Sequence, residues 1–398
     1  MRVLLYSSQF PTPRDPNGGI FTAQLAQAMA RHAEVDAVCP LPWCPDWSWF
    51  RRHPHWGVVA GVPASGRHGD IAVRYPKYPL IPRLSGPWQA LLQAAAVWFA
   101  LRRLLQARAY DVINAHWLYP DGVAATLLGR WLGVPVVLTA LGSDVNVYAR
   151  MRARRPQIRW ALGRARAVTA VSRALRERLV ELMGDVARLH YIPNGVDTAR
   201  FFPLDAVARA ACRRRLGLDP DRRYVVFVGR LHPVKGVPLL LDALAKLAGE
   251  SRLTFDTVLV GDGAERAALE RQAQSLGLGG RIRFAGERPH AEVPQWLQAA
   301  DVFCLPSLME GMPNVVLEAL ACRVPVVATR VGAIPDIIER HTGIVVEPGS
   351  VVALADALHE ACARDWRQTE QASSSSWEDW EGVARRYLSV LDAPAAHT

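Results

Sequence analysis

Two acidic residues stand within the otherwise largely apolar stretch MEGMPNVVLEALA, which spans residues 309–321. Glu310 precedes Gly311, and Glu318 follows eight positions later inside a helix-forming run. Pro313 fits the beginning of that helix, because a missing N–H group costs little in the first turn. An ionised carboxylate only accepts hydrogen bonds, and its two oxygens match two adjacent hydroxyl groups. The spacing predicts one acid in a loop and one on a helix, each suited to a diol such as those of a sugar or a ribose.

A basic loop earlier in the chain could hold an anion. In VFVGRLHPVKG, residues 226–236, a predicted strand ends at Gly229, Arg230 follows it, and Lys235 precedes the next helix. The amide groups at a helix N-terminus bind anions, and a hydrogen bond to a charged group is worth about 1.5–3 kcal/mol. The loop fits a pyrophosphate, and a solvated turn with incidental cations is the alternative that it leaves open by itself.

Both loops follow short apolar runs, which alternate with amphipathic helical patterns along the chain. The runs expected to form strands are RVLLYSS, EVDAVCP, IAVRYP, DVINAHW, VPVVLTAL, AVTAVS and RLHYIPN, and then YVVFVGR, FDTVLVGD, RIRFAGE, DVFCLPS, VPVVATR and GIVVEP. The alternation predicts an α/β protein with two Rossmann-like, doubly wound parallel sheets. Such sheets bind ligands at the carboxyl ends of their strands, so we expect the site in a cleft that the two domains face.

The turn-rich segment after Asn194 divides the chain. We expect a first domain over residues 1–195, a second over residues 196–375, and a C-terminal helix and tail over residues 376–398 that pack back on the first domain. A chain of 398 residues, half of them hydrophobic, is long enough for two cores. Six cysteines without a C-x-x-C pair suit a reducing cytosol.

No window approaches twenty uncharged apolar residues, so we expect no membrane span. The longest candidate, WQALLQAAAVWFALRRLL, is interpreted as a buried amphipathic helix. Charge is uneven, since residues 1–195 hold 24 Arg and Lys against 11 Asp and Glu. Seven of these arginines lie in one predicted helical stretch, residues 150–166, and the loop at residues 42–56 mixes Trp with Arg and His. The mixture suits an anionic lipid surface. The alternative is a solvated arginine face with buried tryptophans, which fits the Trp loop alone equally well.

Together these motifs resemble a known family. The spacing G-R-x-x-x-x-K-G, followed by P-S-x-x-E-G-x-P-N-x-x-x-E-A-x-A, is similar to the retaining glycosyltransferases of family 4, which have the two-domain GT-B fold. NGGIF, HWLYPDG, LGSDVN and YIPNGVD resemble the branch that builds cell-surface polysaccharides, including teichuronic-acid-type transferases. The loop EGMPN departs from the E-G-F-G of many relatives, which leaves the donor sugar open.

The resemblance implies roles for particular residues. Arg230 and Lys235 would bind the donor diphosphate, Glu310 the donor-sugar hydroxyls and Glu318 the ribose hydroxyls. His116 would contact the donor sugar near the reacting carbon, and a hydrogen-bonded strand-end histidine is the alternative. Asp144 would orient the acceptor, although Asp also caps turns in such loops. The remaining donor-binding candidates are Gly18, Gly19, Gly229, Gly261, Asp262, Gly311, Met312, Pro313 and Asn314.

The expected reaction is retaining, metal-independent transfer of a sugar from a nucleotide sugar, with UDP favoured, to a lipid-linked or polysaccharide acceptor. No cofactor is expected. Asp219-Pro220-Asp221 matches the Asp-x-Asp motif of metal-dependent transferases, but it precedes a strand and is interpreted as a turn. Related transferases extend lipid-linked saccharides, so we expect a cytoplasmic enzyme bound peripherally to the inner face of the cytoplasmic membrane.

Other classes of function fit less well. A dinucleotide oxidoreductase needs G-x-G-x-x-G after a strand, and GDGAER has Arg at the last position. A sugar-nucleotide epimerase of the same fold class is the nearest alternative enzyme. A nucleic-acid-binding protein would explain the basic first half, but not the acid pair, and we expect no nucleic-acid partner.

Overall fold

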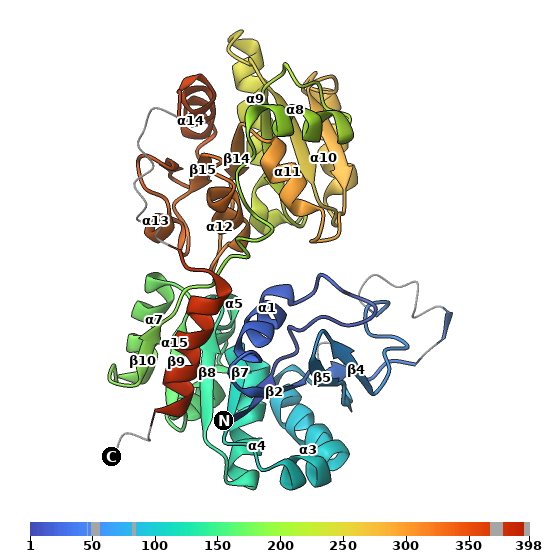
Figure 1. The fold of residues 1–398 in the computed structure, drawn as a ribbon, viewed down its shortest axis with the longest axis vertical. Helices are drawn as coiled ribbons and strands as arrows, with labels where there is room; N and C mark the ends of the chain where they lie inside the picture. The colour runs from blue at the N-terminus through green and yellow to red at the C-terminus, as the bar shows by residue number, and fades with distance from the viewer. Residues whose placement is uncertain (46, 49–55, 82–84, 367–376, 394–398) are drawn as a thin grey trace. The chain divides into compact units, whose positions relative to one another are not determined.

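The computed structural model describes residues 1–45, 47–48, 56–81, 85–366 and 377–393. The chain divides into two compact units, which are described separately. The first contains Met1–Asn194 together with Trp380–Thr398, and the second contains Gly195–Asp379. The chain thus leaves the first unit once and returns to it at its C-terminal end (Figure 1).

The first unit is built on an eight-stranded sheet with the order β10-β9-β8-β7-β1-β2-β5-β4. Its pairings are parallel except for that of β4 with β5. The strands are β1 (Arg2–Tyr6), β2 (Glu34–Val38), β4 (Ser65–His68), β5 (Ile71–Arg74), β7 (Val112–His116), β8 (Val136–Ala140), β9 (Ala167–Ala170) and β10 (Leu189–Tyr191). Because the strand order reverses between β1 and β7, the loops after these strands lie at the position where such sheets bind ligands.

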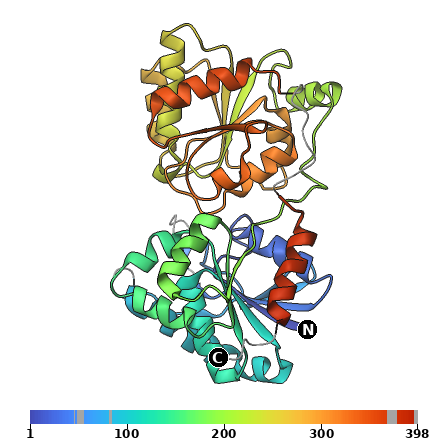
Figure 2. The ribbon, with the colours of Figure 1, turned by 90° about the vertical axis from the view of Figure 1, so that its left-hand side faces the viewer.

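Helices cover both faces of this sheet (Figures 1 and 2). They are α1 (Ile20–Met29), α3 (Gln89–Arg108), α4 (Val123–Leu132), α5 (Ser143–Asn146), α6 (Arg155–Leu162), α7 (Arg173–Met183) and α15 (Trp380–Asp392). The last of these, α15, packs on α1, as the sequence predicted. Its buried face, which includes Tyr387 and Leu391, shares one core with Leu25 and Met29 of α1.

The second unit has a six-stranded sheet with the order β13-β12-β11-β14-β15-β16, and all its pairings are parallel. The strands are β11 (Tyr224–Val228), β12 (Asp256–Val260), β13 (Ile282–Gly286), β14 (Val302–Leu305), β15 (Val326–Thr329) and β16 (Gly343–Val346). The helices are α8 (Ala206–Arg215), α9 (Val237–Gly249), α10 (Arg266–Ser275), α11 (Val293–Ala299), α12 (Asn314–Ala321), α13 (Ile334–Ile337) and α14 (Val351–Ala363). Here the order reverses between β11 and β14, which places the loops after these two strands next to each other.

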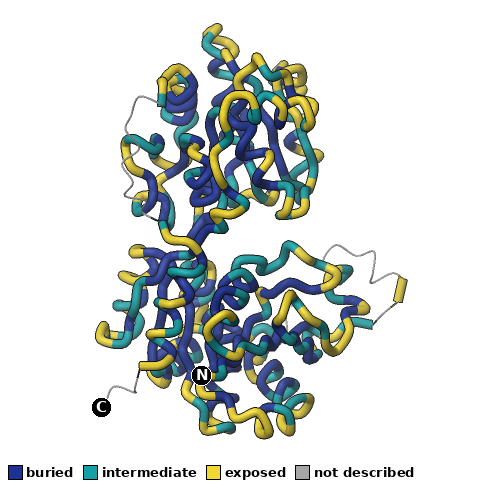
Figure 3. Tube along the Cα trace, viewed as in Figure 1, coloured by how far each residue is buried: buried dark blue, intermediate teal, exposed yellow. Residues whose placement is uncertain are grey.

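The α/β prediction with two parallel sheets is confirmed, and the central strands of both sheets are buried (Figure 3). Each predicted run contains a strand, while β4 and the two-residue strands β3 (Leu41–Pro42) and β6 (Lys77–Tyr78) were not predicted. Ser65–His68 is a polar edge strand, and two residues are too few for an apolar pattern.

One prediction about a helix is wrong, and a second is confirmed only in part. The arginine-rich stretch is not one helix, because a 3-10 turn (Tyr148–Arg150) and a further turn precede the short α6. The apolar stretch that contains α3 does form a helix, but its solvent side exposes Leu91 and Phe99. Within the residues that the structure describes, no helix combines the length and the apolar character needed to cross a bilayer. Most of the Trp-rich loop lies outside the described residues.

Candidate functional site

The loops after β11 and β14 lie side by side in the second unit. After Gly229 and Arg230, a 3-10 turn (Pro233–Lys235) leads into α9. The backbone N–H of Leu308, in the loop after β14, donates to the carbonyl oxygen of Val234 at 2.8 Å. This contact brings the basic loop against the segment that carries Glu310, so the sheet order brings together two motifs that are far apart in the sequence.

Lys235 and Glu310 form an ion pair at this position. The ammonium of Lys235 donates to Oε1 of Glu310 at 2.7 Å, and the hydroxyl of Ser307 donates to the same oxygen at 2.6 Å. The Glu310 side chain is 9% exposed and that of Lys235 is 24% exposed. The predicted phosphate ligand and the predicted sugar ligand therefore hold each other, a pairing that the sequence did not reveal.

Arg230 belongs to the same loop after β11 as Lys235, and it is exposed to solvent. In the part of the chain that the structure describes, neither a hydrogen bond nor an ion pair involves its guanidinium. A guanidinium carries five N–H donors in a planar array that matches phosphate oxygens. Arg230 is thus available to an anion, whereas Lys235 must exchange its carboxylate partner for one.

Glu318 lies in α12 and is 4% exposed. Its Oε1 is 2.8 Å from Nε2 of His290, in the loop between β13 and α11. The ring of Phe201 lies against His290, and Arg200 donates to the His290 carbonyl at 2.9 Å. His290 was not proposed as a site residue, although it closely follows the run RIRFAGE, which was expected to form a strand. Glu318 is thus oriented by a neighbouring side chain.

The backbone between the two acids is also fixed. Met312, Pro313 and Asn314 are buried, and the N–H of Ala333 donates to the carbonyl oxygen of Gly311 at 3.0 Å. Pro313 occupies the N-cap position, and α12 begins at Asn314. Because this turn of the chain is buried, the orientation of the backbone amide groups before α12 is fixed.

The turn after β12 packs on the same basic loop. A Cβ atom on Gly261 would lie 1.9 Å from the carbonyl oxygen of Gly229, so only glycine permits this approach. Asp262 accepts from the N–H of Gly263 at 2.7 Å and from Arg266 at 2.9 Å. These predicted donor-binding residues therefore have a structural role, because Gly261 packs on Gly229 and the carbonyl of Asp262 accepts from the N–H of Leu231 at 2.9 Å.

In the first unit, two predicted site residues follow β1 and one ends β7. Gly19 has a φ of 65° and approaches the backbone of Gln9, and Gly18 donates its N–H to Asp15 at 2.8 Å. His116 is 2% exposed, and its Nε2 is 2.8 Å from Oδ1 of Asn114. Burial lowers the pKa of His116 to about 3, so the imidazole is neutral at physiological pH.

The ring of His116 stacks on Tyr387 of α15, with centroids 5.9 Å apart. Asp144 is fully buried, and its carboxylate accepts hydrogen bonds from backbone amides of its own turn and from that of Leu118 at 2.9 Å. Burial raises the pKa of Asp144 despite these bonds. Asp144 thus holds the loops after β7 and β8 in place. It would affect an acceptor only indirectly, through the positions of these two loops.

Asp121 is a buried acid that the sequence analysis did not select, although the motif HWLYPDG contains it. Its Oδ2 accepts from the N–H and the hydroxyl of Ser8, both at 2.7 Å, and its Oδ1 accepts from the Gln93 side chain at 2.9 Å. The carboxylate therefore joins the loop after β1, the loop after β7 and α3. Burial raises the pKa of Asp121 to about 7.

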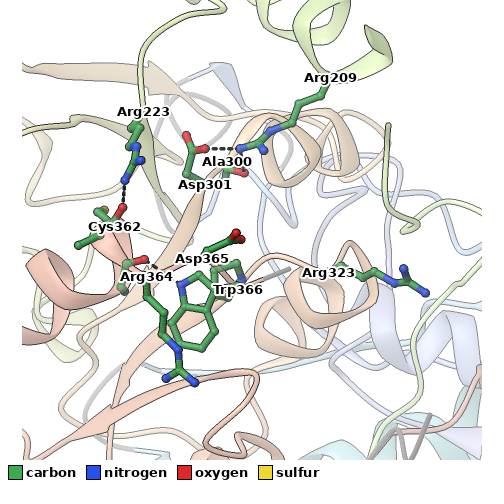
Figure 4. A pocket seen from close by; sticks show the side chains of 12 residues that line it. Arg209, Arg223, Ala300, Asp301, Arg323, Cys362, Arg364, Asp365 and Trp366 are labelled. Carbon is green, nitrogen blue, oxygen red and sulfur yellow. Dashed lines mark hydrogen bonds and ion pairs between the residues drawn. The ribbon is translucent and has the colours of Figure 1, made fainter. Parts of the chain in front are cut away.

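The second unit has a pocket at the amino ends of β14 and β15, whereas the candidate site lies at the carboxyl ends of the strands (Figure 4). It has a volume of about 430 Å³ and is lined by residues that include Arg209, Asp301, Arg364 and Trp366. Asp301 forms ion pairs with Arg209 and Arg213 of α8, both at 2.5 Å. These contacts fix α8 to the sheet, and the pocket is separate from the candidate site.

The cations and carboxylates at the ends of β11 and β14 can bind a diphosphate beside a hydroxyl-rich group. Among the described residues, no group of three or more His, Cys, Asp or Glu side chains is arranged to hold a metal ion. Asp219 and Asp221 lie in a turn ahead of β11, away from the strand ends that carry the candidate site.

Comparisons with known proteins cover both units. Residues 209–374 match the family model described as "Glycosyl transferases group 1", and residues 18–200 match "Glycosyltransferase Family 4". The teichuronic acid biosynthesis glycosyltransferase TuaC, as it is named in Bacillus subtilis, is 30% identical over 98% of this chain and 99% of its own. A GDP-mannose-dependent α-(1-6)-phosphatidylinositol monomannoside mannosyltransferase of Mycolicibacterium smegmatis is 38% identical over 78% of this chain and 80% of its own.

Solved structures share the fold. Anabaena HepE in complex with UDP superposes with a TM-score of 0.74 at 22% identity, over 98% of this chain and 99% of its own. A sucrose-phosphate synthase from Thermosynechococcus elongatus gives a TM-score of 0.76 at 22% identity, over 98% and 97%. These likenesses show that the arrangement of strands and helices is shared with proteins of known structure.

Proposed function

Because the chain belongs to glycosyltransferase family 4, the group 1 glycosyl transferases with the GT-B fold and retaining chemistry, we propose that its donor is a UDP-sugar. We further propose that its acceptor is a lipid-linked saccharide or a growing cell-surface polysaccharide. The name of the Bacillus subtilis relative, which refers to teichuronic acid, supports the second point. The likeness to a structure that contains UDP agrees with the first.

One observation carries the assignment of the donor site: the Lys235–Glu310 ion pair, formed by the loop that also contains the exposed Arg230, at the point where the strand order reverses. The pair keeps two charges balanced in a largely buried position. A donor could replace both partners at once, because its diphosphate would accept from Lys235 while a sugar hydroxyl would donate to Glu310. Binding would then leave neither charge uncompensated.

The same groups explain how transfer could occur. Negative charge grows on the diphosphate as the bond to the sugar breaks, and fixed cations and amide groups stabilise that charge most in the transition state. Arg230, Lys235 and the backbone ahead of α12 would supply this stabilisation without a metal ion. Retention would follow from attack of the acceptor on the face that the leaving phosphate occupies, with that phosphate accepting the acceptor's proton.

For the ribose we propose Glu318, held by His290, as the hydroxyl acceptor, and for the sugar hydroxyls the loop Gly311–Asn314 beside Glu310. His116 would act as a neutral hydrogen-bonding group toward the donor sugar, because its low pKa rules out a cationic role. Asp144 would act on the acceptor by holding the loops after β7 and β8. Gly18, Gly19, Gly229, Gly261 and Asp262 would shape the backbone around the donor.

The test is an assay of released nucleoside diphosphate with UDP- and GDP-sugars in turn, in the presence and absence of saccharide acceptors. We expect acceptor-dependent release of UDP that EDTA does not inhibit. Release that requires GDP-mannose would replace the proposed donor, and strict dependence on a divalent ion would overturn the metal-free route. Conversion of the sugar without any acceptor would instead indicate an epimerase.

We also propose that the enzyme works as a peripheral protein at the inner face of the cytoplasmic membrane. The positive excess of the first half supports this, and Arg152, Arg155 and Arg159 are exposed. Arg154 is left out of the substitutions, because its guanidinium packs over the Tyr148 ring, 4.4 Å from the ring centroid. Replacing Arg152 and Arg155 with Ser should therefore weaken binding to anionic vesicles at low salt without loosening the fold.

A further inference from the structure

Helix α3 is apolar on two sides. Its buried side carries small and aliphatic residues that include Ala90, Ala94 and Val97. Its solvent side carries Leu91 and Phe99, which are 46% and 74% exposed, and the residue before the helix, Trp88, is 64% exposed. Residues three, eight and eleven positions apart lie on one side of a helix, so these three side chains form one stripe. No charged residue occurs between Trp88 and Leu101.

The stripe continues into further aromatic and basic residues. Arg102 and Arg103 lie one turn beyond Phe99 on the same side and are exposed. Trp131 of the neighbouring helix α4 is 43% exposed, and its ring packs on that of Trp98 at 5.6 Å. The "α3 surface" is defined as the exposed residues Trp88, Leu91, Phe99, Arg102, Arg103 and Trp131.

The arginine-rich stretch adjoins the start of this surface. The side chain of Gln157 in α6 donates to the carbonyl oxygen of Pro87 at 2.8 Å. A Cβ atom on Gly86 would lie 3.2 Å from the guanidinium of Arg154. Exposed aromatic residues and a flanking set of arginines thus belong to one region of the first unit.

Charge decides between two possible partners. Helices α3, α4 and α6 contain no acidic residue. If two copies of the chain met through this surface, arginines would face arginines without carboxylates to pair with them. An anionic bilayer interacts favourably with both kinds of residue on this surface, because its headgroups attract arginine and its interface accommodates Trp and Phe. An exposed apolar stripe of this kind otherwise costs free energy in water.

From these observations we infer that the α3 surface is the part of the molecule that docks on an anionic lipid bilayer, with Trp88, Leu91 and Phe99 entering the interface and Arg102 and Arg103 contacting headgroups. The inference deepens the membrane association proposed above and does not depend on which sugar is transferred. It assigns the apolar part of binding to a helix that lies outside the candidate donor site.

The test uses the full chain and cosedimentation with phosphatidylcholine vesicles, with or without phosphatidylglycerol. The apolar variant is Trp88→Gln, Leu91→Gln and Phe99→Gln, since glutamine preserves helix propensity. Its matched control replaces Val186, Val207 and Val352 with Gln, which are 50%, 81% and 55% exposed elsewhere. The basic variant is Arg102→Ser and Arg103→Ser, and its control is Arg214→Ser and Arg215→Ser, two exposed neighbours in α8.

We expect the apolar variant to lose at least about tenfold in vesicle partitioning at both low and high salt, because buried apolar area is not screened. The basic variant should lose binding mainly at low salt, and both controls should bind like the wild type. Wild-type binding by the apolar variant would overturn the inference. So would a wild-type dimer in sedimentation velocity that the apolar variant dissociates while vesicle binding is unchanged.

An activity assay with a water-soluble acceptor tests this inference separately from the proposed function. We expect the apolar variant to keep wild-type kcat with such an acceptor and to lose activity only toward a vesicle-borne one. If the wild type binds vesicles through α3 but transfers no sugar, the proposed function fails and the docking surface stands. If the wild type transfers sugar but does not bind anionic vesicles, the docking surface and the proposed membrane association fail, while the proposed transfer reaction stands.

Discussion

At the scale of single residues, Lys235 and Arg230 should contribute to turnover more than to stability. Both cations would face a charge that increases as the diphosphate leaves, so Lys235→Ala or Arg230→Ala should lower kcat by about a hundredfold. Steady-state kinetics and a thermal unfolding curve measure the two effects. Lys246→Ala is a matched control, because that lysine pairs with Glu250 at the C-terminal end of α9. Turnover near that of the wild type would contradict the assignment.

Substitutions of the two glutamates should change different kinetic constants. Glu310→Gln removes the charge that balances Lys235, next to the proposed sugar, and should mainly lower kcat. Glu318→Gln should mainly raise the KM for the donor, because a ribose contact is made equally in the ground and transition states. His290→Ala, which releases Glu318 from its partner, should resemble Glu318→Gln. Identical defects at Glu310 and Glu318 would refute this division.

Asp121 should make stability depend on pH. Its pKa of about 7 in the folded state lies above the ordinary value of 3.8. The protonated form is therefore favoured by folding, and its contribution is complete below about pH 4 and is lost as the pH rises through about 7. Asp121→Asn should remove this loss, which is on the order of a few kcal/mol.

The variant should fit without strain, because the Gln93 amide can turn and present its Oε1 to the new side-chain amide. That buried oxygen has no hydrogen-bond partner among the described residues. Urea unfolding of both proteins from pH 4 to pH 7.5 measures the difference in unfolding free energy. A difference that stays constant over this range would show that Asp121 does not titrate there.

At the scale of elements, α15 should be essential to the first unit. Tyr387 is 1% exposed, stacks on His116 and lies within hydrogen-bonding distance of Thr169 at 3.5 Å. Tyr387→Ala should lower the unfolding free energy by about 3–5 kcal/mol, as for other large aromatic residues in cores. Arg385→Ala, on the exposed side of the same helix, is the control. Equal melting temperatures for the two variants would contradict this role.

The sequence predicts a helix or a strand correctly where its hydrophobic pattern fits only one kind of secondary structure. The central strands are continuous apolar runs because helices cover both their faces, so RVLLY and YVVFV are identifiable from composition. The polar edge strand Ser65–His68 carries no such pattern. For α3, the same apolar residues suit a core face and an exposed face, and only the fold shows that both are present.

The candidate site is predictable to a similar extent. Arg230, Lys235 and Glu310 could be selected because they follow strands, and strand ends converge at one edge of a parallel sheet. That Lys235 pairs with Glu310 depends on β11 and β14 being neighbours, which no local pattern specifies. His290 could not be selected either, because its link to Glu318 joins loops that are separated in sequence.

At the scale of the whole molecule, the two units should respond differently to ligand. A nucleotide that binds only the folded second unit stabilises that unit, by about 2.7 kcal/mol at a hundredfold excess over Kd. Hydrogen exchange with and without UDP should therefore show added protection within Gly195–Asp379 and little in the core of Met1–Asn194. Protection spread evenly over both units, or confined to the first, would contradict a donor site on β11 and β14.

The position of α15 also bears on synthesis of the chain. Val383, Ala384, Tyr387 and Leu391 complete the core of the first unit, yet they are translated after the whole of the second unit. On the ribosome, the first unit therefore lacks α15, and the apolar surface of α1 that α15 covers stays exposed while Gly195–Asp379 is made. The later unit can finish folding first, and the exposed face of the earlier one would be the natural point of attachment for a chaperone on the nascent chain.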